Sequence, residues 1–450
     1  MVKKYGKSLE IIERDEKVYP KFQRLSYFPL TIKSAHGAII EDADGNEYID
    51  MISAASTLNT GSCHPKVVNA IKEQVDKCIS YTPVYTYSEP LVKLAEVLCE
   101  ITPGDFEKRV LFGLSASDSN DGAIKLARAY TGKKKMVSFI GAYHGSTYGA
   151  LSLSAISLNM RRKVGPLLPE IEHIRYPQCY RCSFKCKPET CNLECLDDFK
   201  TAMQTYMPPD EIAAVIMEPI EGDGGLIVPP VKYMEAIYKL CKDNNILFIS
   251  EEVQQGLGRT GKWFGIEHFG IVPDMIVMGK SLGAGLPLSA VVGRKEIFEA
   301  LGAPAHLFSM TGNQTCCAAA FASIDVIRNE KLLDKSSDLG AHAKARFEEM
   351  KDRYDIIGDV RGLGLSIGVD LVKDRESKVG DKDAAAKICC RAWERGVLLI
   401  YLANGVLRIQ PPLVITKEQL DKAIDVIEKS IVDYLNGNIP DEILKFAKGW

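Results

Sequence analysis

One lysine in this sequence stands where an amine could act as a nucleophile. Lys280 follows the apolar run Met275–Met278 and precedes the glycine-rich segment Gly283–Pro287. Burial lowers the pKa of a lysine amine, and an uncharged amine can attack an aldehyde carbon. The segment therefore predicts an amine nucleophile at the end of a buried strand. The competing interpretation is a surface lysine that ends the strand.

Two adjacent acids end another apolar run. Glu251 and Glu252 follow Phe248, and Gln254 comes two residues later. Because side chains alternate between the faces of a strand, the two carboxylates should point in opposite directions. Buried carboxylates are costly unless they are paired. One of them could face the ring nitrogen of a pyridine cofactor, or both could simply begin a polar loop.

A serine-rich segment joins a predicted strand to a predicted helix. Ser115, Ala116 and Ser117 lie after Arg109–Leu114, at the start of an amphipathic stretch that runs to about Tyr130. Backbone N–H groups and hydroxyls at a helix N-terminus bind phosphate. Ser115 or Ser117 could equally be a plain helix cap.

Two further side chains suit a cofactor or a substrate. Tyr143 follows the apolar run Met136–Ile140, and its ring could stack on a flat heterocycle or pack in the core. Arg408 lies in an otherwise apolar segment. A guanidinium there could bind a carboxylate through two hydrogen bonds, or it could form a structural ion pair.

The elements that must position these residues alternate between strand and helix, which is typical of a mostly parallel sheet covered on both faces. Functional residues in such sheets gather in the loops beyond the carboxyl ends of the strands, and the motifs above lie at such ends. Strands are predicted at Arg109–Leu114, Met136–Ile140, Ala213–Pro219, Ile246–Ile249 and Met275–Met278, and helices at 117–130 and 233–242.

The two ends of the chain predict a smaller α+β domain. Gly37–Asp50 is typical of a hairpin with its turn at 44–46. Because 450 residues exceed what one hydrophobic core usually serves, we expect residues 1–65 and 326–450 to form this domain and 66–325 to form a larger one. In the C-terminal part we expect helices at 335–354 and 416–435 and strands near 364–369 and 397–400.

Taken together, these motifs resemble the class III aminotransferase family, a branch of the fold-type I pyridoxal-phosphate enzymes, from Gly37 to Pro412. The resemblance implies an α/β fold whose large domain has a mostly parallel seven-stranded sheet. It also implies pyridoxal 5′-phosphate as the cofactor. Lys280 would form the Schiff base, and Arg408 would bind the substrate carboxylate. The other implied cofactor contacts are Glu218, Glu251 at the pyridine nitrogen, Gln254 at the phenolic oxygen, Tyr143 against the ring, and Ser115, Ala116 and Ser117 at the phosphate.

The resemblance also concerns assembly. Ser309 matches a phosphate-binding threonine that family members donate from the neighbouring subunit, which implies a homodimer or homotetramer with shared active sites. Two positions depart from the family pattern. Glu251 stands where an Asp is usual, so the pyridine contact must accommodate an extra methylene. Ala116 stands where Gly is usual, and alanine narrows the backbone angles of the phosphate loop.

Two reactions remain open within this family. Returning the α-proton of an amino acid to the cofactor gives transamination, whereas returning it to Cα from the opposite face gives racemisation and works best with two acid–base groups. Family racemases have Asp where Asp223 stands, so Lys280 and Asp223 would serve opposite faces. Asp223 lies between glycines and could instead be a turn residue. Stretches at 141–149, 157–160, 303–308 and 448–450 are also similar to the isoleucine 2-epimerase type of racemase.

The sequence therefore predicts a racemase or epimerase that acts on neutral, aliphatic or branched-chain amino acids, since no second basic residue for an acidic side chain is evident. The alternative is an aminotransferase that uses a keto acid. A third hypothesis is a cofactor-binding regulator, which would need a DNA-binding segment that the N-terminus does not offer.

Composition narrows the partners and the compartment. A net charge of -3 without a basic block argues against a nucleic-acid partner. No apolar run is long enough to span a bilayer. The charged N-terminus lacks an apolar signal core, and the thirteen cysteines suggest reduced thiols. We expect a cytoplasmic protein.

A cysteine-rich insert at 176–198 interrupts the large domain. Its spacings permit a tetrahedral zinc or an iron–sulfur site, although they are not a clean pair of CxxC knuckles. The alternative is a loop of reduced thiols, and the prediction includes no metal site. The cysteines are Cys179, Cys182, Cys186, Cys191 and Cys195.

Overall fold

The computed structural model describes residues 5–402, 404–447 and 449, so that Lys448 and Trp450 of the segment 448–450 noted above lie outside the described residues. It divides the chain into two compact units. The first unit combines residues up to 64 with those from 334 onward, and the second unit spans 65–333.

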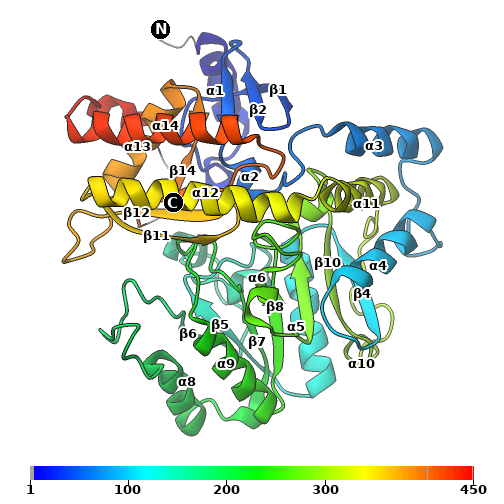
Figure 1. Ribbon diagram of the computed structural model, residues 1–450. Coiled ribbons are helices and arrows are strands. Elements are labelled where there is room, and N and C mark those ends of the chain that lie inside the picture. Colours follow the sequence, from blue (N-terminus) through cyan, green and yellow to red (C-terminus); the bar gives the residue numbers. More distant parts are fainter. Residues whose placement is uncertain (1–4, 403, 448, 450) are drawn as a thin grey trace. The chain divides into compact units, whose positions relative to one another are not determined.

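The second unit is built on a seven-stranded sheet in the order β4-β10-β9-β8-β7-β5-β6 (Figure 1). β10 is antiparallel to both of its neighbours, and the remaining pairs are parallel. This arrangement confirms the predicted mostly parallel α/β sheet. The strands are β4 (Lys108–Gly113), β5 (Lys135–Ile140), β6 (Ile171–Arg175), β7 (Ile212–Met217), β8 (Leu247–Glu251), β9 (Met275–Met278) and β10 (Ser289–Arg294).

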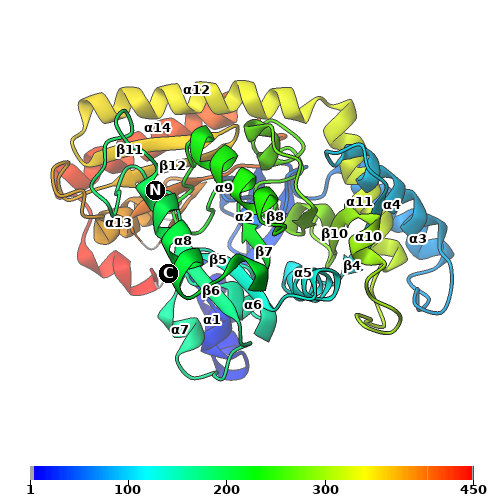
Figure 2. The ribbon, with the colours of Figure 1, turned by 90° about the horizontal axis from the view of Figure 1, so that it is seen from below.

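Helices cover both faces of this sheet. Figure 2 shows α5 (Ala116–Thr131) on one side and α9 (Val231–Asp243) on the other. Every residue of β7 is buried, as expected for a strand with helices on both faces, and this explains its unbroken apolar sequence. The other helices of the second unit are α3 (Pro65–Lys77), α4 (Glu89–Ile101), α6 (Tyr148–Leu153), α7 (Leu158–Arg161), α8 (Glu194–Thr205), α10 (Lys295–Phe298) and α11 (Gln314–Asn329).

The strand directions bring six loops to one edge of the sheet. β4, β5, β6, β7, β8 and β9 all run the same way, because β10 is antiparallel to both β4 and β9 and the other pairs are parallel. We call this edge the carboxyl edge. The loops that begin there start at Leu114, Gly141, Tyr176, Glu218, Glu252 and Gly279.

The first unit joins the two ends of the chain. The predicted hairpin forms from β2 (Ile39–Asp42) and β3 (Glu47–Asp50), and β3 pairs in parallel with β13 (Val397–Leu398). A second sheet has the order β11-β12-β15-β14. Further elements are α1 (Gly6–Val18), α2 (Ser53–Ser56), β1 (Ile32–His36), β11 (Ile357–Leu363), β12 (Ser366–Leu371), β14 (Ile400–Leu402), β15 (Val406–Ile409), α13 (Lys382–Glu394) and α14 (Lys417–Leu435), with α12 (Leu332–Arg353) leading in from the second unit.

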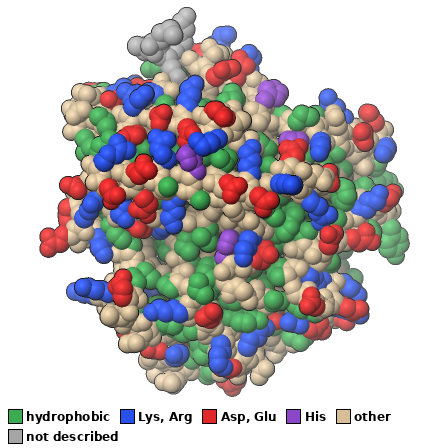
Figure 3. All heavy atoms as spheres, in the orientation of Figure 1, with side chains coloured by type: hydrophobic (Ala, Val, Ile, Leu, Met, Phe, Trp, Pro, Cys, Tyr) green, Lys and Arg blue, Asp and Glu red, His purple; other side chains and the backbone are tan. Residues whose placement is uncertain are grey.

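Charged side chains are mixed over the face drawn in Figure 3, where Lys and Arg alternate with Asp and Glu. This mixing agrees with the small net charge of -3. None of the described helices is both long and apolar enough to cross a bilayer.

Candidate active site

The start of α5 lies against the segment that carries the candidate lysine. Ser115 caps α5, since its hydroxyl accepts from Asp118 N at 3.4 Å, while the Asp118 carboxylate accepts from Leu114 N at 2.8 Å. Gly279 is so close to this turn that a Cβ built on it would lie 2.9 Å from Ala116 Cβ. The cap interpretation is therefore correct, and the capped turn also borders Lys280.

The loop after β5 closes over the same turn. Ser146 N donates to Ser117 Oγ at 3.1 Å. Gly145 has φ +133°, and a Cβ there would lie 2.1 Å from Ser117 Oγ. Only glycine combines this backbone angle with so close an approach. Tyr143, in the same loop, is half-buried, and its N–H donates to Glu218 Oε1 at 3.1 Å.

Lys280 is half-buried and is separated from β9 only by Gly279; it is the first residue of the short 3₁₀ helix Lys280–Gly283. Its φ of +44° lies in the left-handed region, which costs a residue with a side chain roughly 1–2 kcal/mol. Strained backbone of this kind concentrates at functional sites.

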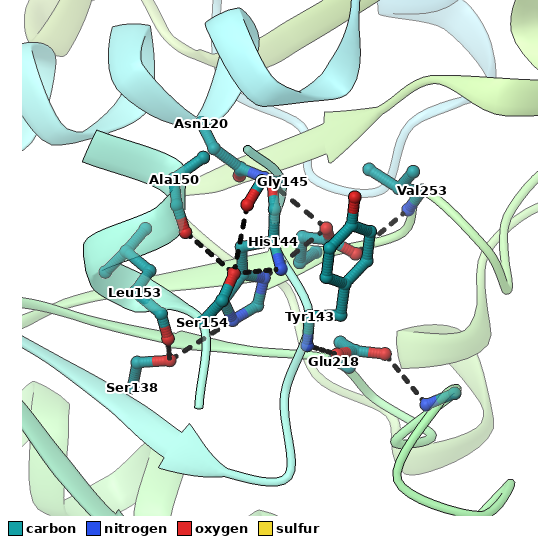
Figure 4. A network of polar contacts seen from close by, with 12 residues as sticks. Asn120, Ser138, Tyr143, His144, Gly145, Ala150, Leu153, Ser154, Glu218 and Val253 are labelled. Atoms are coloured by element: carbon teal, nitrogen blue, oxygen red, sulfur yellow. Dashed lines mark hydrogen bonds and ion pairs between the residues drawn. The ribbon is translucent and has the colours of Figure 1, made fainter. Parts of the chain in front are cut away.

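Glu251 ends β8 and is buried among weakly placed donors from His144, Asn120 and Val253, which are labelled in Figure 4. His144 Nδ1 and Asn120 Nδ2 each lie 3.4 Å from its Oε1, and Val253 N donates to Oε2 at 3.3 Å. All three distances are at the long end for a hydrogen bond. The carboxylate is thus held in place but incompletely satisfied.

Glu252, the next residue, has a different role. Its carboxylate accepts from Ile266 N and Gly265 N, both at 2.8 Å, and from Ser250 Oγ at 3.1 Å. These contacts tie the loop after β8 to the end of the strand. As predicted, the two acids face different surroundings, and Glu252 is the structural one.

Two more buried acids come from the loop after β7. Glu218 accepts from Tyr143 N and, at 2.8 Å, from Gly222 N, while burial and then the charge of Glu251 raise its pKa to about 7. Burial and then the charge of Glu218 raise the pKa of Glu221 well above its usual value. Oε1 of Glu221 makes no hydrogen bond within the described part of the chain. Glu218 and Glu221 therefore hold their protons more tightly than free acids.

Asp223 and Gln254 meet at the carboxyl edge. Gln254 Nε2 donates to Asp223 Oδ1 at 3.4 Å, and both side chains are almost fully buried. A Cβ on Gly222 would lie 2.6 Å from the Gln254 amide, so a larger residue at this position would require the amide to shift. The contact links the loop after β7 to the loop after β8.

Two predicted residues are not part of this cluster. Ser309 is exposed, in the loop between α10 and α11. Arg408 belongs to the first unit, where it is buried on β15 and its Nε donates to Gln410 Oε1. Gln410 Nε2 in turn donates to Ser366 Oγ at 2.8 Å.

Sequence reasoning assigned no role to Asn120, Ser138 or His144, all of which are buried. Asn120 reaches Glu251 from inside α5, and Ser138 lies 3.2 Å from His144 Nε2. A signal was present for two of them. Ser138 is the one polar residue inside the apolar run Met136–Ile140, and His144 directly follows Tyr143.

The cysteine-rich insert lies beside β6 in the second unit. Cys191 Sγ donates to Glu194 Oε2 at 3.2 Å. Burial raises the pKa of the Cys195 thiol to about 11, and nearby thiols add to this effect. Among the described residues, no three His, Cys, Asp or Glu side chains are grouped so as to hold a metal ion.

Comparison with known proteins identifies the family to which the chain belongs. A family model described as "Aminotransferase class-III" matches residues 22–431. The chain belongs to the class III aminotransferase family. It is 48% identical over 437 residues to isoleucine 2-epimerase of Lentilactobacillus buchneri, covering 97% of both chains. It is 46% identical over 442 residues to leucine/methionine racemase of Thermococcus litoralis, covering 98% of this chain and 99% of the other.

A solved structure gives the same assignment. A transaminase from the marine bacterium Virgibacillus superposes with a TM-score of 0.87 at 28% identity, covering 95% of this chain and all of the other. Class III aminotransferases are fold-type I enzymes, so the predicted fold and family are confirmed. The chain is a pyridoxal-phosphate-dependent enzyme that acts on an amino acid.

The carboxyl edge fits pyridoxal phosphate group by group. A capped helix start with hydroxyls and backbone N–H groups suits a phosphate. The amine of Lys280, the buried acid Glu251 and the amide of Gln254 suit an aldehyde, a ring nitrogen and a phenolic oxygen. Glycines at 145, 222 and 279 leave room that a Cβ would fill. The residues present therefore fit this cofactor.

Proposed function

We propose that this protein is a pyridoxal-phosphate-dependent racemase or epimerase that inverts Cα of neutral, aliphatic amino acids by two-base proton transfer. The observation that carries the proposal is Asp223, a nearly buried carboxylate that accepts from Gln254 at the carboxyl edge. The similarity to an isoleucine 2-epimerase and a leucine/methionine racemase supports it.

In this proposal each residue has a separate task. Lys280 supplies the amine that holds the cofactor and handles the proton on one face of the substrate Cα. Asp223 handles the proton on the other face. When bound, pyridoxal phosphate withdraws electrons from the substrate Cα, which makes its proton removable. Arg408 binds the substrate carboxylate, on the basis of its place in the family motif.

The remaining residues hold the cofactor. The backbone around Ala116 and the hydroxyls of Ser115 and Ser117 bind the phosphate. Tyr143 covers the ring. Contacts at the far side of the ring and at its phenolic oxygen come from Glu218, Glu251 and Gln254.

The first experiment separates racemisation from transamination. Purified holoenzyme is incubated with L-isoleucine or L-valine in deuterated water, without a keto acid. We expect loss of optical purity, with solvent deuterium at Cα, over many turnovers. If product stops at one equivalent of enzyme and resumes only when a keto acid is added, the protein is an aminotransferase and the proposal is wrong.

A second experiment concerns Asp223. In Asp223→Asn, racemisation should fall by roughly 10²–10⁴-fold, the usual contribution of a positioned acid–base group, while the absorption of the bound cofactor stays. Asp198→Asn changes an exposed carboxylate on α8 and should behave like the parent. Unchanged racemisation in Asp223→Asn would remove this residue from the mechanism.

We also infer a homodimer or homotetramer with shared active sites. Support comes from exposed apolar side chains on both sides of Ser309 and in the segment before α4, because large exposed apolar patches mark interaction surfaces. Mixing inactive Lys280→Ala with inactive Ser309→Asp should restore part of the activity if Ser309 serves the neighbouring site. The apolar residues are Tyr81, Tyr85, Tyr87, Leu307, Phe308 and Met310.

We infer a cytoplasmic location from the thiols. All thirteen cysteines lie among the described residues and all are free. Free thiols persist in a reducing compartment.

A further inference from the structure

Asp223 lies at the tip of a short closed hairpin in the loop after β7. Glu221 N donates to the Ile227 carbonyl and Ile227 N donates to the Glu221 carbonyl, both at 3.0 Å. Inside this pair, Gly225 N donates to the Gly222 carbonyl at 3.1 Å. The position of Asp223 therefore depends on how the base of the hairpin, at Glu221 and Ile227, is held.

The Glu221 side chain is packed between this hairpin and the loop after β5. A Cβ built on Gly141, in the loop after β5, would lie 2.7 Å from Glu221 Oε1. A Cβ built on Gly224 would lie 2.3 Å from Glu221 Oε2 and 2.8 Å from its Cγ. The end of the Glu221 side chain thus lies against the residue that directly follows Asp223.

The carboxyl of Glu221 has no charge partner in this position. Glu221 is 2% exposed, and its Oε1 makes no hydrogen bond within the described part of the chain. Burial and then the charge of Glu218 raise the pKa of Glu221 well above its usual value. An uncharged acid is the form that these surroundings favour, because burial penalises the charged form and a neighbouring carboxylate repels it. Glu221 therefore contributes a shape rather than a charge.

We propose that Glu221 is a positioning residue for Asp223: its uncharged side chain fills the space between the loops after β5 and β7 and fixes the hairpin that presents Asp223 to the substrate Cα. This inference deepens the proposed two-base mechanism and rests on it. An acid–base group must lie within hydrogen-bond reach of the proton that it moves, and a displacement of about 1 Å can cost about 10²-fold in rate. Loss of the Glu221 side chain should therefore weaken proton transfer on one face of Cα and spare the other face.

Deuterium exchange at Cα separates the two faces. Purified holoenzyme is incubated with each enantiomer of valine in deuterated water, and both inversion and exchange without inversion are measured. In the parent, each enantiomer should be inverted and should gain deuterium. In Glu221→Ala, inversion of both enantiomers should fall about 10²-fold. The enantiomer whose proton faces Lys280 should still exchange within a few-fold of the parent, because that amine can remove and return the proton on one face.

Three further variants serve as controls. Glu221→Gln retains an uncharged side chain of nearly the same size and should keep inversion within a few-fold of the parent. Glu252→Ala removes another buried acid from the same edge of the sheet, so any loss of inversion there should be matched by the loss of exchange. Glu221→Asp shortens the side chain by one methylene and should give an intermediate loss of inversion. It replaces Glu221→Ala in the comparison if the alanine variant does not fold.

Amide hydrogen exchange tests the hairpin itself, on the holoenzyme without substrate. The N–H groups of Gly225 and Ile227 are protected by the hydrogen bonds that close the hairpin, and local opening exposes such groups to exchange. The peptide that covers 221–227 should exchange faster in Glu221→Ala than in the parent. It should exchange at the parent rate in Glu221→Gln and in Glu252→Ala.

Failure of this inference differs from failure of the proposed function. Three results would overturn the role of Glu221 in a parent that racemises: parallel loss of inversion and exchange in Glu221→Ala, unchanged amide exchange in that variant, or an equal loss of inversion in Glu221→Gln. A parent that inverts neither enantiomer would overturn the proposed function, and the link from Glu221 to proton transfer with it. Faster amide exchange in Glu221→Ala would in that case still support Glu221 as the residue that holds the hairpin.

Discussion

Glu251 and Glu252 are adjacent, chemically identical and both buried, yet their surroundings differ. Glu252 accepts three hydrogen bonds, two of them at 2.8 Å from consecutive backbone N–H groups. Glu251 has three donors at 3.3 to 3.4 Å. Glu252 is used to close a loop, whereas Glu251 retains the capacity to accept a hydrogen bond from a further partner.

These two environments distinguish a structural acid from a functional one. A buried carboxylate that is fully satisfied stabilises the fold, because each donor would otherwise be left unpaired. A buried carboxylate that is loosely satisfied is costly unless a further partner completes its hydrogen bonds. Buried polar groups with incomplete hydrogen bonding are expected at functional sites. Glu251 matches that description, and Glu252 does not.

The largest expected effect separates the two acids by activity. Glu251→Gln removes the charge and retains the shape, so racemisation should fall on the order of 10²–10³-fold, as when a preorganised electrostatic contact is lost. Glu252→Gln should stay within a few-fold of the parent. Steady-state kinetics on both variants, with the cofactor absorption as a check on loading, measures the effect. Equal losses of racemisation activity in the two variants would show that the two acids do not differ in function.

Stability should show the reverse order. Glu252→Ala leaves the N–H groups of Gly265 and Ile266 buried without an acceptor, so the free energy of unfolding should fall by roughly 3 kcal/mol. Glu251→Ala should cost less, because its contacts are longer. Urea denaturation of the two variants measures the difference. A larger loss in Glu251→Ala would show that satisfaction does not distinguish these acids.

The pH dependence of the free energy of unfolding tests the burial of Glu252. Burial raises the pKa of Glu252 from 4.5 to about 7, so the folded state binds this proton more tightly than the unfolded state. Its contribution to stability is therefore full below pH 4.5 and is lost as pH rises toward 7. Glu252→Gln does not titrate there. The difference in free energy of unfolding between the parent and Glu252→Gln should therefore shrink by on the order of 2 kcal/mol between these two pH values.

Thermal or urea denaturation of both proteins from pH 4.5 to 8 provides the measurement. Glu218 has a similarly raised pKa, but it is present in both proteins and cancels in the difference. A gap that widens with pH would mean that the Glu252 carboxylate is stabilised in its charged form.

Much of the fold was predictable because its signals are local. The run Met275–Met278 is β9 as predicted, and the helix expected at 117–130 is α5 at 116–131. β6 and β10 were not identified, since Ile171–Arg175 contains Glu and His and β10 runs antiparallel after a glycine-rich turn. Partial exposure allows β6 its polar residues.

The residues of the candidate site likewise fall into those that could be predicted from the sequence and those that could not. Residue types and strand ends indicated Lys280 and the pair Glu251 and Glu252, whereas Gln254 was indicated only by the family resemblance. His144 and Ser138 could not be assigned, because their roles depend on which oxygen each one meets across the sheet. Alternation along the strand did not distinguish Glu251 from Glu252, since it fixes opposite directions but not what lies in each direction; only the family resemblance singled out Glu251.

The smallest change in the series is expected at Ala116, which, like Glu251, departs from the family pattern. The test is whether the Ala116 side chain limits the space beside Lys280. A Cβ on Gly279 would lie 2.9 Å from Ala116 Cβ. Gly279→Ala should therefore weaken cofactor binding about tenfold, and Ala116→Gly alone should change it little. The double variant should recover roughly 1 kcal/mol of that loss, since contacting residues couple by this amount. Absorption titration with pyridoxal phosphate measures all four proteins. Strict additivity would mean that Ala116 and Gly279 do not share the space beside Lys280, and that the phosphate turn tolerates alanine for another reason.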